Sequence, residues 1–372
     1  VRHAAVDQDI GWEKYSMKKY SLNMLLVVFA IGLLFAAHFR IIDSYIQIVA
    51  MTIGINIMMS TSLNLVNGNM GDFTCGHAAF MCIGAYISSV LSVFCFGSKF
   101  GDPLLPAASV LIVFPIIVLI GGAVAAVSSL LVSVPSFKTR DDYLAIISIA
   151  VNYMIISAIE NMDFIGGSRG FQGMKDTVWA MIDIFDGPWM LFWVINFTIF
   201  TVWVIRRFIS STYGKGVNAI CQDEVAAEIM SVNTNKIKII NFMVAAGLAG
   251  CAGGLYAHII GYVNPQSFNI LKSTEALVMV YLGGMGSLSG AVISAIIFTG
   301  LLEVLRSQAI IDGLLSPVTM MFPDWEPSAG VIKWVMIPLL LVIVMQFRPE
   351  GIMGNRELSD VFPWLKKFYR FK

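Results

Sequence analysis

Long apolar runs recur along the whole chain, and shorter polar segments separate them. Runs of this length match the roughly 20 apolar residues that a helix needs to cross a bilayer. They predict helices at 21–39, 44–66, 77–96, 105–132, 143–159, 189–205, 239–260, 275–284, 288–305 and 329–347. The expected fold class is therefore an all-α polytopic membrane protein with about ten transmembrane segments.

The eighth run, 275–284, is too short for a full crossing, and it ends at the glycine-rich break Gly283–Ser287. Short or interrupted segments are tolerated at membrane depth only where protein or a water-filled cavity surrounds them. We therefore expect this segment to be a partial or broken helix.

The distribution of positive charge predicts the orientation. Lys and Arg favour the cytoplasmic side, and ten crossings with the N-terminus inside place most of the 24 Lys and Arg residues there. The predicted organisation is a cytoplasmic N-terminal segment at 1–20, a transmembrane domain at 21–347 and a cytoplasmic tail at 348–372. The largest cytoplasmic loop is then 206–238.

Composition supports a membrane protein and excludes several functions. Hydrophobic residues make up 57% of the chain and charged residues 13%, against roughly a quarter charged in soluble domains. Mean hydropathy is +0.78, and the net charge of +0 gives no indication of nucleic-acid binding. The sequence contains no GxxxxGK[ST] or HExxH motif. We expect no enzymatic activity, no cofactor and no metal site.

The predicted spans contain amides and hydroxyls but few charges. Asn56, Ser60 and Asn64 recur at every fourth position and share one helix face, and Asn152 lies in the fifth span. Such groups either hydrogen-bond between helices or line a path for a polar solute, and both interpretations stay open. An ion-coupled secondary transporter or channel remains an alternative, which ionisable residues deep in the spans would favour. A scaffold without transport is the other.

The loop 206–238 contains a polar stretch that runs into the seventh span. The pattern predicts one helix of about four turns, in which Val217, Cys221, Val225 and Ile229 form an apolar stripe at steps of four. Acidic residues occupy the other faces, which fits poorly with binding to anionic lipid. Docking of a cytoplasmic partner is the better interpretation.

Six segments, in order, resemble the branched-chain amino acid permeases of the LivM type, a family of ABC-importer permeases. They are NLVNGNMGDFTCGHAAFMCIGAY, DDYLAIISIAVNYMI with FIGGSRGFQGM, QDEVAAEIMSVNTNKIKIINF, AGLAGCAGGLYA, LGGMGSLSGAVISA and FRPEGIMG. One such segment would be weak evidence, whereas six in the same order are strong evidence. The resemblance extends over roughly 64 to 354.

This resemblance implies the architecture of an ABC-importer permease. The implied partners are two cytoplasmic ATP-binding subunits, a second permease chain (identical or a sister), an external solute-binding protein and the lipid of a bacterial-type inner membrane. The implied solute is a branched-chain amino acid or a related small polar solute. Both termini are expected in the cytoplasm.

The resemblance also implies roles for individual residues. The coupling helix that contacts the ATP-binding subunits would comprise Gln222, Asp223, Glu224, Ala226, Ala227, Glu228, Ser231 and Val232. Small residues let membrane helices approach closely, and the positions expected to act in helix packing or as hinges are Gly68, Gly71, Gly250, Gly254, Gly283, Gly284 and Gly286. The candidate translocation path is formed by Asn56, Ser60, Asn64 and Asn152.

Overall fold

The computed structural model describes most of the chain between the first and last predicted spans. The described residues are 32–39, 42–97, 104–137, 143–184 and 187–306, together with 335, 338–339, 342–343, 346–347, 350–354 and 357. The predicted N-terminal segment and most of the predicted tail and tenth span lie outside these residues. Of the first predicted span, the described part is helical at 32–38.

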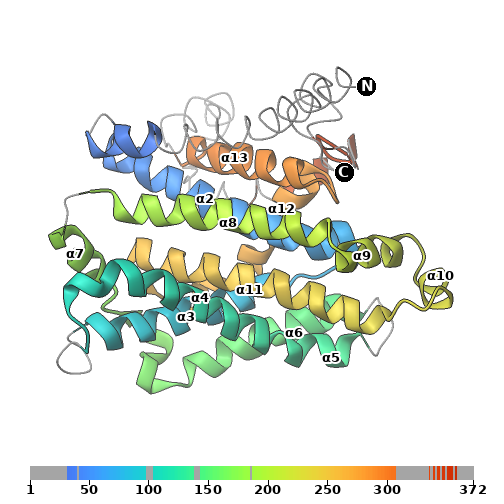
Figure 1. Cartoon of the computed structure of the whole chain (residues 1–372), viewed down its shortest axis with the longest axis horizontal. Coiled ribbons are helices and arrows are strands. Elements are labelled where there is room, and N and C mark those ends of the chain that lie inside the picture. The colour runs from blue at the N-terminus through green and yellow to red at the C-terminus, as the bar shows by residue number, and fades with distance from the viewer. Residues whose placement is uncertain are drawn as a thin grey trace, which may run out of the picture.

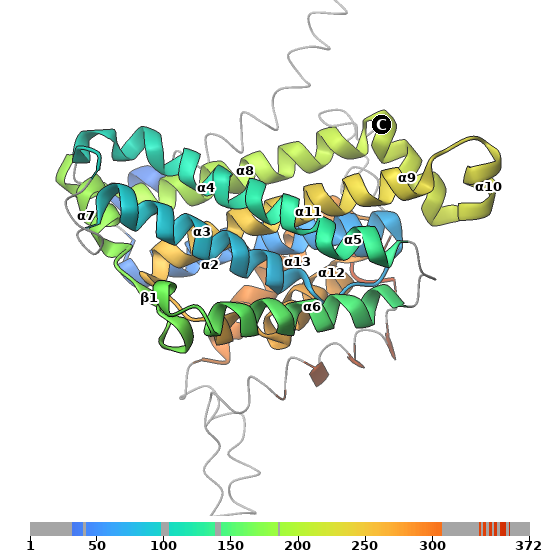
Figure 2. The same ribbon diagram turned by 90° about the horizontal axis from the view of Figure 1, so that it is seen from below.

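The described part is a bundle of helices that run mostly along one common direction (Figures 1 and 2). The helices are α2 (Ser44–Asn64), α3 (His77–Phe96), α4 (Val110–Ser128), α5 (Leu130–Ser136), α6 (Tyr143–Glu160), α7 (Lys175–Ile184), α8 (Trp189–Ile209), α9 (Thr212–Gln222), α10 (Glu224–Ile229), α11 (Thr234–Ile260), α12 (Ile270–Gly283) and α13 (Leu288–Val304). A π-helix, η1 (Leu65–Met70), continues α2. Short 3₁₀ turns are η2 (Ala107–Ser109), η3 (Asp163–Ile165), η4 (Gly167–Arg169) and η5 (Pro265–Phe268).

The two ends of the bundle differ. At one end, α10 projects beyond the other helices, and α7 lies at the opposite end (Figures 1 and 2). Near α7, the strands β1 (Phe171–Gln172) and β2 (Tyr262–Val263) form an antiparallel pair in which Phe171 faces Val263. This pair joins the loop after α6 to the loop after α11.

Six helices in the described part are long and apolar enough to cross a membrane. They are Ser44–Met70, His77–Phe96, Val110–Ser136, Tyr143–Glu160, Trp189–Ile209 and Thr234–Ile260. These correspond to the second to seventh predicted spans, so the chain is a multi-pass membrane protein. The expected total of about ten segments is not confirmed, because α12 and α13 are shorter and the outermost runs lie largely beyond the described residues.

The eighth segment is a short helix, as its sequence predicts, although it begins five residues earlier than expected. Helix α12 has 14 residues and ends at Gly283. The next residues, Gly284 and Gly286, have φ angles of +107° and +81°, a region that side chains with a Cβ rarely enter. The glycines therefore end the helix and turn the chain into α13.

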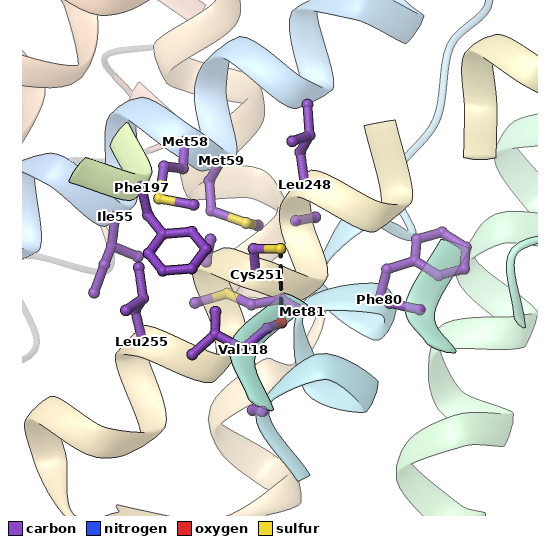
Figure 3. Packing of buried hydrophobic residues seen from close by; sticks show 14 of the residues in the cluster. Ile55, Met58, Met59, Phe80, Met81, Val118, Phe197, Leu248, Cys251 and Leu255 are labelled. Carbon is purple, nitrogen blue, oxygen red and sulfur yellow. Dashed lines mark hydrogen bonds between the residues drawn. The ribbon is translucent and has the colours of Figure 1, made fainter. Parts of the chain in front are cut away.

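The core lies where α11 packs along α3 and α4. Glycines set the closeness of this contact, since a Cβ on Gly84 would lie 2.1 Å from the carbonyl oxygen of Gly250. Apolar side chains from these three helices and from α2 and α8 close the core around the crossing (Figure 3): Met58 and Met59 from α2, Met81 from α3, Val118 from α4, Phe197 from α8, and Leu248 and Leu255 from α11. Small residues at a helix crossing are the usual means of close packing in a membrane, where lipid tails are as apolar as the helices.

Candidate functional site: the α9–α10 loop and the buried polar residues

The polar stretch in the loop 206–238 forms two helices, so the prediction of one helix of about four turns is wrong. Asp223 has an extended backbone with φ −161° and ψ 109°, and its Oδ1 accepts a hydrogen bond from the amide of Ala226 at 3.0 Å. Asp is a strong N-cap residue because its side chain satisfies an amide that the new helix leaves free. Asp223 therefore ends α9 and starts α10.

This break also separates the predicted apolar stripe into two parts. Val217 on α9 is buried, whereas Val225, Ile229 and Met230 are 67%, 77% and 78% exposed. We call these three residues the α10 tip. Because α10 projects from the end of the bundle (Figure 1), the α10 tip forms an apolar surface that the described part of the chain does not cover.

Acidic residues of α10 hold it against the start of α11. The Glu224 Oε2 lies 2.9 Å from the Nζ of Lys238, and Glu228 accepts a hydrogen bond from the Thr234 hydroxyl at 2.8 Å. Ala227 is buried, and its carbonyl oxygen accepts from the amide of Val232. These contacts tie α10 to the start of α11 and leave its tip exposed.

The remaining positions expected in the coupling helix lie on the surface. Gln222 and Ala226 are exposed, and Ser231 adopts a left-handed backbone with φ +65° where the chain turns after α10. At the end of α9, the exposed residue Cys221 has its sulfur near the backbone of Gly71. Partial desolvation, together with the nearby carboxylate of Asp72, raises the pKa of this thiol.

Three of the four polar residues expected along a path face α13. The Asn56 amide donates to the Thr299 hydroxyl at 2.8 Å, and the Ser60 hydroxyl donates to the carbonyl oxygen of Ala291 at 3.2 Å. Asn64 donates to the Ser287 carbonyl and accepts from the Gly286 amide. All three are buried, so in this structure they form a polar seam that joins α2 to α13.

Asn152 differs from the other three. It is completely buried on α6, and neither its Oδ1 nor its Nδ2 has a hydrogen-bond partner among the described residues. An amide has several donor and acceptor positions, and burying them without partners is costly. Asn152 is therefore the member of the set with unused hydrogen-bonding capacity.

The seven glycines expected in packing or as hinges lie at close contacts or at turns. A Cβ would lie 2.1 Å from the nearest atom of another residue at Gly68, and 2.5 Å at Gly250, Gly283 and Gly284; the distance is 2.9 Å at Gly254 and 3.1 Å at Gly71. Gly71, Gly284 and Gly286 have positive φ angles. The first neighbour of Gly68 is the side chain of Asn64, and that of Gly284 is the backbone of Gly354.

Two contacts of the folded chain are not predicted from its sequence. Lys238 is buried and pairs with Asp72 as well as with Glu224, and Glu357 caps the first amides of α13. A signal existed for Asp72, because it is the only Asp, Glu, Lys or Arg between Asp43 and Lys99. Its partner could not be found from spacing, since the two residues lie on segments far apart in the chain.

Comparison with known proteins identifies the family. A family model described as "Branched-chain amino acid transport system / permease component" matches residues 45–345. The chain is 27% identical to the high-affinity branched-chain amino acid transport system permease protein LivM of Salmonella typhimurium, over 91% of this chain and 76% of that protein. It is 28% identical to LivM of Escherichia coli K12, over 88% and 74%.

A second kind of permease is also similar. LivH of Salmonella typhimurium is 25% identical, over 53% of this chain and 54% of that protein. No solved structure matches the chain significantly. Because the family model covers most of the chain, the protein belongs to the family of branched-chain amino acid transport permeases.

Proposed function

We propose that this chain is a membrane-spanning permease subunit of an ATP-driven importer for branched-chain amino acids or a related small polar solute. The relatives LivM and LivH are permease proteins of branched-chain amino acid transport systems. The observation that carries the proposal for this chain is the α10 tip, an exposed apolar surface on a helix that projects from the bundle (Figure 1).

In this proposal, the α10 tip docks on a cytoplasmic ATP-binding subunit. Two such subunits, a second permease chain and an external solute-binding protein complete the importer. The acidic residues of α10 are tied to α11, so the side chains that remain for a partner are apolar. Complete burial of a Val, Ile or Met side chain contributes roughly 1.5–3 kcal/mol, so an interface that covers the tip gains binding energy from it.

The contacts between loops support a topology in which several loops share one side of the membrane, and the distribution of Lys and Arg favours the cytoplasm for that side. The ten-crossing topology puts 67–76, 206–238, 285–287 and 348–372 on one side, and described residues of these segments meet at the end that carries α10. Lys238 pairs with Asp72, Asn64 bonds to Gly286, and a Cβ at Gly284 would lie 2.5 Å from the Gly354 carbonyl oxygen. We propose that 206–238 is the cytoplasmic coupling loop of a transmembrane domain spanning 21–347.

For the solute path, we propose a principal role for Asn152. The hydrogen-bonding groups of Asn56, Ser60 and Asn64 are used within the polar seam, whereas those of Asn152 are not. An amide without a partner can bind a polar solute or water when the helices around it separate. Alternation between outward-open and inward-open packings supplies that separation.

The test replaces apolar residues of the α10 tip. The tagged chain is purified in mild detergent from its native host, and the amount of ATP-binding subunits that co-purifies is measured by quantitative mass spectrometry. We expect Ile229→Asp to lower co-purification at least 10-fold, because a buried apolar anchor contributes roughly 2 kcal/mol or more. Uptake of labelled leucine into proteoliposomes with internal ATP should fall in parallel.

The matched control is Tyr213→Asp, which places the same charge on an exposed residue of α9 and should leave co-purification unchanged. If Ile229→Asp binds the ATP-binding subunits as the unchanged chain does, the α10 tip is not their docking surface. If no ATP-binding subunit accompanies the unchanged chain, the alternative of a secondary transporter gains support.

A further inference from the structure

Lys238 brings three separate segments together at the end of the bundle that carries α10. It lies in the second turn of α11, and its side chain is only 4% exposed. Its Nζ is 2.9 Å from the Glu224 Oε2 on α10 and 3.7 Å from the Asp72 Oδ2 in the loop that follows η1. The ring of Phe137 lies 5.9 Å from the ammonium group.

The burial of this cluster makes it sensitive to the loss of one member. The Asp72 side chain is 10% exposed and that of Glu224 is 33% exposed, so water screens these charges less than it would on an open surface. Removing the cation from such a cluster leaves carboxylates close together without compensation, which is more costly than removing the whole set. The lysine thus keeps α10 and the loop at a fixed separation.

The end of α9, which leads directly into α10, also contacts this loop beside the lysine. A Cβ at Gly71 would lie 3.1 Å from the Cys221 sulfur at the end of α9. Gly71 has a φ of +84°, so the loop bends sharply here and directs Asp72 towards α11. Charge pairing and packing therefore hold the same junction.

The loop that carries Asp72 leads to three membrane helices. The amide of Cys75 donates to the Ser148 hydroxyl on α6 at 3.1 Å. At the start of α3, the amide of Ala78 donates to the Ser273 hydroxyl on α12 at 3.0 Å. The loop Gly71–Gly76 is thus connected at one end to Lys238 and at the other end to α3, α6 and α12.

We propose that Lys238 is a positioning residue that couples α10 to the loop Gly71–Gly76, so that a displacement of α10 reaches α3, α6 and α12. This inference rests on the proposed function, in which an ATP-binding subunit moves α10. Lys238 does not belong to the α10 tip and does not need to touch the partner. It transmits the movement of the tip to these three helices, of which α6 carries Asn152.

The test uses the complete importer in proteoliposomes, with binding protein and solute supplied outside. Lys238→Met keeps the length of the side chain and removes the charge. We expect the ATP-binding subunits still to co-purify and basal ATP hydrolysis to persist, while the solute imported per ATP hydrolysed falls at least 10-fold. Lys236→Met is the matched control, because Lys236 is exposed on the same helix, and it should leave this ratio unchanged.

The double variant Asp72→Asn with Lys238→Met distinguishes a role of Lys238 in coupling from a role in stability alone. It removes a carboxylate together with the cation, so it should recover much of the thermal stability that Lys238→Met loses. In the double variant, the amount of solute imported per ATP hydrolysed should stay low. The single variant Lys238→Arg keeps the positive charge and should retain much of the transport ratio of the unchanged importer. A double variant with both the stability and the transport ratio of the unchanged importer would overturn the inference.

A second measurement does not depend on the ATP-binding subunits. Hydrogen exchange of the isolated chain, followed by mass spectrometry, should become faster in peptides from Gly71–Gly76 and from α10 in Lys238→Met but not in Lys236→Met. Unchanged exchange in both segments would contradict the junction itself. Failure of the unchanged chain to assemble with ATP-binding subunits would instead contradict the proposed function and leave this junction standing.

Discussion

The crossing of α3 and α11 allows a sharp test of the close packing between helices. Replacing Gly84 with Ala places a Cβ 2.1 Å from the Gly250 oxygen and 2.4 Å from the Gly250 Cα. Both neighbours are backbone atoms, which cannot rotate away as a side chain does. The contact must widen to the ordinary 3.4 Å, so the two helices must move apart by more than 1 Å.

The magnitude follows from two opposing effects. Overpacking a close-packed interior typically costs about 1–3 kcal/mol, and a clash with backbone places Gly84→Ala near the upper value. Exchanging Gly for Ala inside a helix stabilises it by roughly 1 kcal/mol. We therefore expect Gly84→Ala to lower the free energy of unfolding by about 2 kcal/mol.

Thermal unfolding in mild detergent, followed by size-exclusion chromatography of the heated protein, measures the effect. The control is Gly300→Ala on α13, since nothing lies within 4 Å of the position of its added Cβ. This control receives only the gain in helix propensity, so the two variants should shift the unfolding temperature in opposite directions. A Gly84→Ala protein that unfolds at or above the temperature of the unchanged chain would refute the reasoning.

Two further predictions concern charges at the end that carries α10. Glu357→Gln removes the negative charge that accepts hydrogen bonds from the amides of Leu288 and Ser289, and the same thermal assay should show a loss of about 1 kcal/mol; an unchanged unfolding temperature at low ionic strength would contradict this cap. Asp72→Asn removes an anion that raises the pKa of the Cys221 thiol, so alkylation of Cys221 should become faster and its pH profile should move to lower pH. A profile that does not move would show that Asp72 does not act on this thiol.

The membrane helices could be predicted from the sequence because the length of an apolar run is a local property. The run 77–96, for example, coincides with α3. The short eighth segment was also predictable, since adjacent glycines mark its end. The helix break at Asp223 was missed because a stripe at steps of four favours one continuous helix, although Asp is itself a known N-cap signal.

Contacts between distant segments could not be predicted in the same way. The spacing of Asn56, Ser60 and Asn64 indicates a shared face, but it does not reveal that α13 covers this face. Likewise, the sequence shows Lys238 only as a charge just before the apolar run 239–260. Its burial depends on where Asp72 and α10 lie in the folded chain, and no local pattern contains that information.

Hydrogen bonds at the interruption between α12 and α13 explain why the short helix α12 is stable inside this bundle. Each backbone group that the interruption frees and the bundle buries needs a hydrogen-bond partner, and separate parts of the chain supply such partners. Asn64 donates to the Ser287 carbonyl and accepts from the Gly286 amide, at 3.1 and 3.0 Å.

From the C-terminal side, the amides of Ile352 and Met353 donate to the Leu282 and Gly283 carbonyls at the end of α12, while Glu357 accepts from the first amides of α13. The motif FRPEGIMG and the glycine-rich break therefore form one hydrogen-bonded junction, although they lie far apart in the sequence. Asn64 on α2 completes this junction, because its side-chain amide offers the Ser287 carbonyl a donor and the Gly286 amide an acceptor, as a peptide group would. A polar residue in a membrane helix can thus serve the backbone of a neighbour, and such use accounts for Asn64 without a solute.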